Sequence, residues 1–399
     1  MNRPTGVLQV AKEKRQPLGF SLGVYLRSMD WILLGATLAL VVFGFFMLYS
    51  ATQPSPGYYI KSQATGLILG LAFLIFLSIV NYQWFARWQL YIYGGSIILL
   101  ILTLFIGWGG ETAGVGASRW LNLGFFRLQT AELVKFLLIV ALGAVLAEGV
   151  ELRQRFRFII LCILYVMVPG ILIFLQPDLG TSLVFIAILL VMLTVWGIRL
   201  THLGVLVGTA LFGAVAVLRI LPSLFGIHVL KSWQVARLEV FLDPAKFPKD
   251  NGYQLIQSKI AVGSGMFTGK GYMQGTQHNL SFLPERHTDF IFAVIGEELG
   301  FIGAAVLIGL FAVVAWRAFR IARLSRDVYG SLIAAGVAGV IVFQVFVNIG
   351  MTIGIMPVTG LPLPFVSFGS SSLVVFLMAI GLLESVHVHS VTGGGPKKA

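Results

Sequence analysis

Residues 283–290, which read LPERHTDF, place two acids and two possible cations directly before a long apolar run. Asp289 is the last polar residue before this run, which starts at Phe290. If the run crosses a membrane, the carboxylate lies where water meets hydrocarbon, which is a costly position for a charge. Such a position usually marks a functional site, and Asp289 is therefore the leading catalytic candidate.

Other acids lie at or inside apolar runs. Glu132 and Lys135 are three residues apart and share one helix face, either as part of a polar site or as a buried structural pair. Asp178 either faces the same site or caps a helix, because Pro-Asp suits a helix N-terminus. Glu297 and Glu298 lie about two turns inside the run after Asp289. We interpret this last pair as structural or water-facing rather than catalytic.

Basic residues and serines could complete a site. The cations that could bind an anionic group are Arg119, Lys135, Arg237, Lys259 and Arg286. The serines after a stretch rich in glycine and proline are Ser367, Ser370, Ser371 and Ser372. These hydroxyls either line a polar groove or hydrogen-bond between helices. Acids and bases gathered on one side of a membrane would indicate a polar cavity open to that side.

The composition predicts the elements that must position these residues. The chain has 399 residues, of which 57% are hydrophobic and 11% charged, and its mean hydropathy is +0.91. Apolar runs of about 17 residues or more predict membrane helices. They lie at 31–50, 64–80, 90–108, 131–146, 158–175, 180–196, 203–221, 290–315, 329–353 and 365–383. The predicted fold is an all-α polytopic membrane protein with about ten transmembrane helices.

The distribution of basic residues predicts the orientation of these helices. The first run is too long for a signal-peptide core, so we expect it to remain as a membrane anchor. Basic residues fall in the N-terminal tail and in alternate loops, which predicts cytoplasmic N- and C-termini. The net charge of +12 therefore reflects topology and weak attraction to anionic membrane lipids, and nucleic acid is not expected as a partner.

The chain divides into a basic tail (1–30), seven predicted spans (31–221), a large extracytoplasmic loop (222–289), three spans (290–388) and a C-terminal tail (389–399). The large loop is rich in apolar residues, and 254–262 predict a short interfacial helix. Residues 109–130 predict a glycine-rich re-entrant or interfacial loop. Residues 354–364 contain too much glycine and proline for regular helix, and we expect them to form a rigid cavity wall.

Several polar stretches together resemble one known family. They are ASRWL at 117–121, QPDLGTS at 176–182, residues 253–265, LPERHTDFIFAVIGEE at 283–298, residues 348–351 and PLPFVS at 362–367. From Trp31 to His389 the chain closely resembles the SEDS family of bacterial envelope proteins (shape, elongation, division and sporulation). Residues 275–277 and Arg286 make it most similar to the elongation branch. One departure is Thr130, where family members commonly carry proline.

The resemblance implies a peptidoglycan glycosyltransferase in the bacterial cytoplasmic membrane, polymerising lipid II on the outer face during elongation. It also implies work with a class B penicillin-binding protein and with other proteins of the elongation complex. Asp289 matches the family's essential aspartate. The positions expected to bind substrate are Arg119, Trp120, Glu132, Lys135, Asp178, Arg237, Gln257, Ser258, Lys259, Arg286, His287 and Ser367.

This activity agrees with the chemistry of the residues. A sugar hydroxyl needs a general base, and desolvation beside Phe290 and Pro284 would suit Asp289 to that role. Direct displacement predicts inversion at the anomeric carbon. Magnesium is the expected cofactor, bridging pyrophosphate oxygens, with Asp178 or Glu132 as possible partners. A lipid II flippase and a catalytically silent scaffold are the alternatives, but we find no internal repeat typical of transporters.

Overall fold

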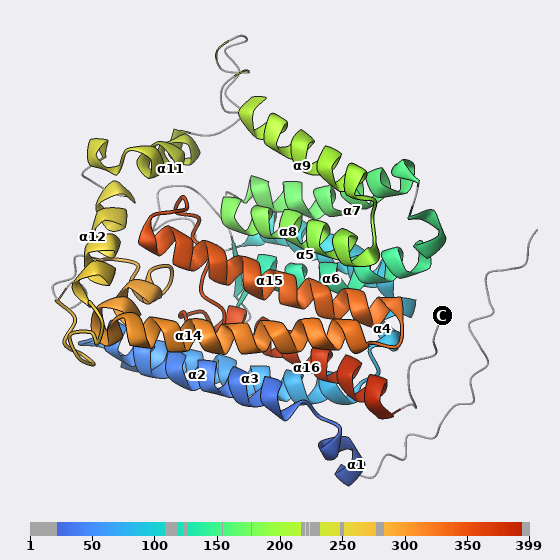
Figure 1. Cartoon of the computed structure of the whole chain (residues 1–399), viewed down its shortest axis with the longest axis horizontal. Coiled ribbons are helices and arrows are strands. Elements are labelled where there is room, and N and C mark those ends of the chain that lie inside the picture. The colour runs from blue at the N-terminus through green and yellow to red at the C-terminus, as the bar shows by residue number, and fades with distance from the viewer. Residues whose placement is uncertain are drawn as a thin grey trace, which may run out of the picture.

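The computed structural model describes residues 22–107, 119–122, 124, 126–153, 155–176, 178–216, 220, 223, 232–247, 251–276 and 283–392. Long helices lie side by side in a single bundle (Figure 1). The first half contributes α1 (Leu22–Arg27), α2 (Trp31–Ala51), α3 (Gly57–Ile79), α4 (Gln83–Arg87), α5 (Gln89–Ile106), β1 (Trp120–Asn122), β2 (Arg127–Gln129), α6 (Thr130–Glu148), η1 (Val150–Leu152), α7 (Phe156–Leu175) and α8 (Leu179–Trp196). The second half contributes α9 (Leu200–Val215), α11 (Ser232–Leu242), η3 (Pro244–Lys246), α12 (Asn251–Ser264), α14 (Ile291–Leu324), α15 (Val328–Ile353) and α16 (Ser370–Thr392).

Helix length and composition confirm a multi-pass membrane protein. Among the described residues, 9 helices are long and apolar enough to cross a membrane, and Leu200–Ala210 within α9 is a shorter apolar segment. Large apolar side chains such as Phe105, 83% exposed, and Ile68, 70% exposed, cover the outside of the bundle. Such a surface suits lipid and not water. The predicted all-α class is therefore confirmed, with α9 in the place of the predicted seventh span.

Acids begin three of the helices and glycines end two of them. Asp30, Asp178 and Asp327 each accept a hydrogen bond from a backbone N–H in the first turn of α2, α8 and α15. Gly197 and Gly354 end α8 and α15 with φ of 90° and 82°, a conformation that glycine adopts without a Cβ penalty. These local signals fix where the apolar runs enter and leave the bundle.

The two ends of the bundle differ. Helices α11 and α12 lie at one end, and α1 and the C-terminal end of α16 lie at the other (Figure 1). Helix α12, which contains the predicted interfacial helix at 254–262, packs against α14 and α15. The described part of the predicted large loop is therefore structured and attached to the bundle.

A loop after α12 is built into a break in α14. Gly300 is non-helical, with φ 62° and ψ −157°. Residues 266–271 replace the missing helix bonds: Lys270 N–H donates to the Glu297 carbonyl at 2.9 Å, and Phe301 N–H donates to the Met266 carbonyl at 3.0 Å. The Glu297 carboxylate also binds Lys270 at 2.7 Å. This contact agrees with the interpretation of Glu297 as a structural residue.

Before α6, the segment predicted as a re-entrant or interfacial loop contains a short hairpin in its described part. Residues 108–118 lie outside the described residues, and β1 and β2 form an antiparallel hairpin that pairs Trp120 with Gln129 and Asn122 with Arg127. The hairpin leads directly into α6 at Thr130. Each strand has three residues, which is too short to leave a period-two pattern that could be read from the sequence.

Candidate functional site

Asp289 lies in the turn that leads into α14, at the same end of the bundle as α11 and α12. The turn is held by local bonds, because the N–H groups of Thr288 and Phe290 both donate to the Glu285 carbonyl, at 3.3 and 3.1 Å. Asp289 is partly buried and Phe290 is fully buried. The motif therefore places its carboxyl at the edge of the apolar core, as the sequence predicted.

The surroundings of Asp289 favour its protonated form. Its pKa is raised to about 7, mainly by desolvation, with smaller contributions from the charges of Glu285 and Asp178. Arg237 and Arg119 oppose this rise in pKa. A carboxyl with a pKa near neutrality can accept and release a proton at physiological pH, which is the property that a general base needs.

The structure brings three predicted site residues into this environment. Arg119, Arg237 and Asp178 come from three separate segments: the start of the hairpin, α11 and the N-terminus of α8. Desolvation lowers the pKa of Arg237, and the nearby Asp289 acts against that lowering. Arginine remains charged at any physiological pH, so both guanidinium groups can face an anionic substrate.

Asp178 has one of the two roles predicted for it, the helix cap, and its charge also acts on Asp289. Its Oδ1 accepts the Thr181 N–H and its Oδ2 accepts the Thr181 hydroxyl, both at 3.0 Å, so it caps α8. Arg119 is anchored next to it by donating from Nε to the Gln176 carbonyl at 3.2 Å. A Cβ on Gly180 would come within 2.6 Å of the Thr359 carbonyl, so the start of α8 lies directly against the 354–369 link. The cap thus fixes the position of one acid beside Asp289.

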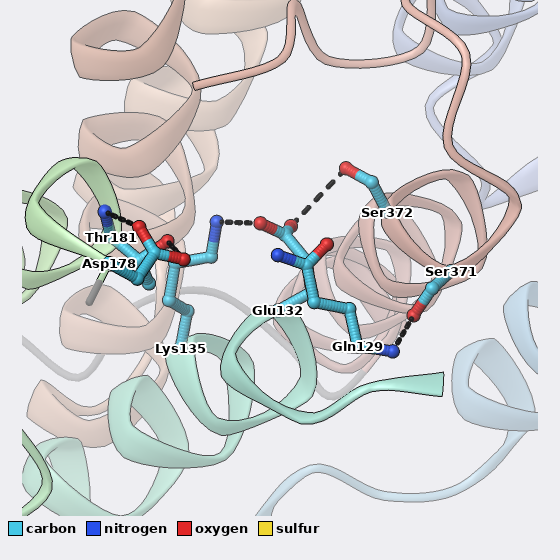
Figure 2. A network of polar contacts seen from close by, with 7 residues as sticks. All are labelled: Gln129, Glu132, Lys135, Asp178, Thr181, Ser371 and Ser372. Carbon is cyan, nitrogen blue, oxygen red and sulfur yellow. Dashed lines mark hydrogen bonds and ion pairs between the residues drawn. The ribbon is translucent and has the colours of Figure 1, made fainter. Parts of the chain in front are cut away.

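Glu132 and Lys135 form a buried ion pair near the start of α6. The Lys135 Nζ lies 2.5 Å from Glu132 Oε1, with the two side chains 3% and 1% exposed. The Ser372 hydroxyl donates to Glu132 Oε2 at 3.2 Å, so the pair links α6 to α16. Figure 2 shows the lysine turned toward Glu132 and the serine reaching it from the other side. In this structure the pair ties α6 to α16, and its predicted part in substrate binding remains a prediction.

Arg286 and His287 point to the neighbouring helices. Arg286 donates to the Ala51 carbonyl at 2.7 Å and to the Gln53 carbonyl at 3.3 Å. The His287 ring packs edge-on against Tyr59, with 4.7 Å between the ring centroids. Burial lowers the pKa of His287, so it is a poor proton donor at neutral pH. Both residues fasten the turn of Asp289 to α2 and α3.

The predicted residues of α12 face different surroundings. Ser258 is fully buried and its hydroxyl donates to the Thr352 carbonyl at 2.8 Å. Lys259 is exposed, and its side-chain carbons lie over Gly354. Gln257 on the same helix and Trp120 in the hairpin are both partly buried. None of these contacts places the four residues beside Asp289, and their binding roles remain predictions.

Three residues near Asp289 were absent from the predicted site. Glu285 raises the pKa of Asp289 by its charge, and it was visible in the same motif. Gly360, with φ 74°, lies beside the carboxyl, because a Cβ there would be in van der Waals contact with Asp289 Oδ2 at 3.5 Å. Asn348 in α15 donates to the Asp289 carbonyl at 2.9 Å. An asparagine inside an apolar helix gives no local signal of this contact.

The described residues contain no group of three or more histidine, cysteine, aspartate or glutamate side chains arranged to hold a metal ion. The charge of Asp178 nevertheless reaches Asp289 and raises its pKa. Magnesium usually keeps several waters and binds one or two carboxylates together with substrate phosphates. Two such carboxylates would fit an ion that arrives with a phosphorylated substrate, although Asp178 already caps α8.

The structure is a bundle of membrane helices with a desolvated carboxyl and two arginines at one end, which defines a multi-pass membrane protein with a candidate polar site. The family described as "Cell cycle protein", which covers FtsW, RodA and SpoVE, matches residues 30–392. The chain therefore belongs to this family, and the prediction of the SEDS family is confirmed.

Two relatives and one solved structure agree with this assignment. A probable peptidoglycan glycosyltransferase FtsW from Trichlorobacter lovleyi is 37% identical over 373 residues, covering 90% of this chain and 93% of the relative. Peptidoglycan glycosyltransferase MrdB from Escherichia coli K12 is 35% identical over 361 residues, covering 90% and 94%. A chain of a peptidoglycan synthase complex that coordinates polymerization and crosslinking superposes with a TM-score of 0.75 at 31% identity, covering 91% and 99%. The predicted peptidoglycan glycosyltransferase is thus confirmed as the class of enzyme.

Proposed function

We propose that this protein polymerises lipid II into glycan strands at the outer face of the bacterial cytoplasmic membrane, with Asp289 as the general base. The observation that carries the proposal is the Asp289 carboxyl, whose pKa is raised to about 7 by desolvation at one end of a membrane bundle. Positioned base catalysis contributes about 10²–10⁴ in rate. The two arginines beside it supply the positive charge that a pyrophosphate substrate needs.

The proposed reaction is a direct displacement. Asp289 removes the proton from an acceptor sugar hydroxyl, whose oxygen then bonds to the anomeric carbon of the donor sugar. The bond from that carbon to the pyrophosphate oxygen breaks, and the lipid pyrophosphate leaves with the electron pair. A single displacement inverts the configuration at the anomeric carbon. The proton on Asp289 returns to solvent or to the leaving group before the next cycle.

Arg119 and Arg237 are the proposed partners of the leaving group, since negative charge builds on the pyrophosphate as the bond breaks. Their charges act on Asp289, which supports a position beside the reacting atoms. If magnesium binds here, Asp289 or Asp178 would be its protein ligand, and the ion would add further positive charge for the leaving pyrophosphate.

We assign the protein to elongation rather than division, as a RodA-type enzyme. The assignment depends on residues 275–277 and Arg286, since the relatives named FtsW and MrdB match the chain at similar identities. The similar chain of a complex that coordinates polymerization and crosslinking supports a transpeptidase partner, which we propose to be a class B penicillin-binding protein. Lipid II and membrane lipids complete the proposed set of partners, together with other elongation-complex proteins.

The test uses the purified protein in liposomes with labelled lipid II and magnesium, with and without a candidate transpeptidase. Wild type is expected to give glycan polymer on a gel, and Asp289→Asn is expected to give none while keeping the wild-type elution and melting profile. Polymer from Asp289→Asn at the normal rate would remove Asp289 from the mechanism. An absence of polymer with every partner, together with movement of lipid II across the liposome membrane, would favour a flippase.

A further inference from the structure

Donors from two other segments hold three consecutive backbone carbonyls of the Asp289 turn. The His287 carbonyl accepts the Phe368 N–H at 2.9 Å, and the Thr288 carbonyl accepts the Ser367 hydroxyl at 2.6 Å. The Asp289 carbonyl accepts an N–H of Asn348 at 2.9 Å. The turn that carries Asp289 is thus hydrogen-bonded at three successive residues to α15 and to the link that leads into α16.

Asn348 connects both of these segments to the turn at once. Its Nδ2 donates to the Asp289 carbonyl at 2.9 Å and to the Leu361 carbonyl at 2.8 Å. Leu361 follows Gly360, which lies beside Asp289 Oδ2. One side-chain amide group therefore sets the separation between the backbone of Asp289 and the wall that its carboxyl faces.

We propose that Asn348 is a positioning residue for catalysis, because its amide holds Asp289 at a fixed distance and orientation from the 359–363 segment. This inference rests on the proposed function of Asp289. It differs from that function because Asn348 acts through the backbone of Asp289 and does not contact the reacting atoms.

Burial makes this contact rigid. Asn348 is 0% exposed and lies in α15, which is one of the most buried helices of the bundle. Side chains locked in a packed element hold a catalytic group more precisely than a loop alone can. Replacing Asn348 with an apolar residue would leave two buried carbonyls without this donor, and the turn could relax toward solvent. A displacement of about 1 Å at a reacting group can cost about 10²-fold in rate.

Gln344 offers a matched control on the same helix. It is also 0% exposed and lies one turn before Asn348, on the same face of α15. Within the described residues, neither its Nε2 nor its Oε1 has a hydrogen-bond partner, so it does not hold the turn or the link. Gln344→Leu and Asn348→Leu each remove one buried amide from α15, and only Asn348→Leu removes bonds to the turn.

The experiment compares both variants with wild type in the lipid II assay and by hydrogen exchange. For Asn348→Leu we expect kcat to fall about 10²-fold and KM to change less than about threefold, because positioning acts on the chemical step. Its backbone amides in 285–290 and 361–368 should exchange faster. The variant should also lose a smaller fraction of its activity at acidic pH than wild type does, because a more solvated Asp289 has a lower pKa. Gln344→Leu should match wild type in all of these measurements.

A wild-type kcat in folded Asn348→Leu, or an equal loss in Gln344→Leu, would overturn the proposal. If Asn348→Leu does not fold, Asn348→Ser takes its place, because its shorter side chain fits the space but is too short to keep both bonds. The proposed function fails separately, since wild type would then give no polymer or Asp289→Asn would remain active. The hydrogen-exchange measurement does not depend on activity. It reports whether Asn348 holds the Asp289 turn, whether or not Asp289 is the general base.

Discussion

Two clusters of acids and bases lie at opposite ends of this protein and differ in what holds the carboxylates of Asp30 and Asp289. At the end away from Asp289, Arg317 donates from Nε to Asp30 Oδ2 at 2.7 Å, and Asp30 N–H donates to Glu384 at 3.0 Å. The second oxygen of Asp30 caps α2 by accepting the Leu33 N–H. All three charged side chains are buried, so this cluster ties α2, α14 and α16 together with little access to solvent.

The Asp289 cluster is built in a different way. In the part of the chain that the structure describes, hydrogen bonds hold the backbone of Asp289, while Arg237, Arg119 and Glu285 influence its carboxyl through charge. A carboxylate that is fully engaged by the protein stabilises the fold. One that is held through its backbone keeps its oxygens available for a substrate proton. The comparison therefore separates a structural cluster from a chemical one by what holds each carboxylate.

The largest expected effect comes from Asp289→Asn. Loss of the base should lower kcat by about 10²–10⁴-fold, and the melting temperature should not fall. The matched change at the other end is Glu384→Gln, which should keep most of the polymerisation rate per folded molecule. Polymerisation kinetics and thermal melts of both variants test this contrast. Equal rate losses would mean that the two clusters do not divide chemistry from structure.

The next effect is on stability. Arg317→Leu would leave Asp30 and Glu384 buried without their cation, and breaking one side of a buried ion pair costs about 3–5 kcal/mol. We expect a clearly lower unfolding midpoint in detergent. Arg320→Gln, an exposed change on the same helix, is the control and should stay within about 0.5 kcal/mol. An Arg317 variant as stable as that control would show that this end contributes little to the fold.

A smaller effect is expected from Arg237→Gln. Arg237 lowers the pKa of Asp289, so its removal should raise that pKa. The acid limb of the pH–rate profile should then move to higher pH, and the rate at pH 7 should fall several-fold. Lys246→Gln, an exposed change just after α11, should leave the profile in place. An unmoved limb in Arg237→Gln would show that its charge does not reach the base.

Much of the fold could be predicted because lipid imposes a simple rule on sequence. Apolar runs of sufficient length predict spanning helices, and nine such helices are present among the described residues. The hairpin before α6 and the loop inserted at Gly300 could not be predicted. Both depend on backbone contacts between segments, and neither leaves a periodic pattern. The burial of Arg317 could not be predicted either. By its position after an apolar run it reads as a cation of a cytoplasmic loop, but in the structure it is buried inside α14.

The candidate site was predictable where polar residues lie next to apolar runs. Asp289 and Asp178 were identified on that basis, and the charge of Asp178 acts on the pKa of Asp289 in the structure. Direction could not be predicted, because sequence does not say which way a side chain turns. Arg286 is an example: it lies three residues from Asp289 in the sequence, but its side chain binds the end of α2. Asn348 was missed because its partners are distant in sequence.

The smallest expected effect is a pH-dependent stability cost of Asp289 itself. Its pKa is about 7 in the folded protein and about 3.9 when unfolded, so the folded state holds an extra proton between these values. The resulting stabilisation is present below pH 3.9 and is lost as the pH rises through 7. Asp289→Asn cannot lose it, so its stability relative to wild type should rise by on the order of 1 kcal/mol from pH 5 to pH 8.

Unfolding midpoints of the two proteins at both pH values measure this change. The stability difference between Asp289→Asn and wild type should change with pH. The matched variant Asp30→Asn should instead be less stable than wild type at both pH values, because it weakens the ion pair with Arg317. A difference between wild type and Asp289→Asn that does not change with pH would mean that Asp289 is as well solvated in the folded protein as in the unfolded chain. The contrast between a desolvated base and a paired structural acid would then rest on the kinetics alone.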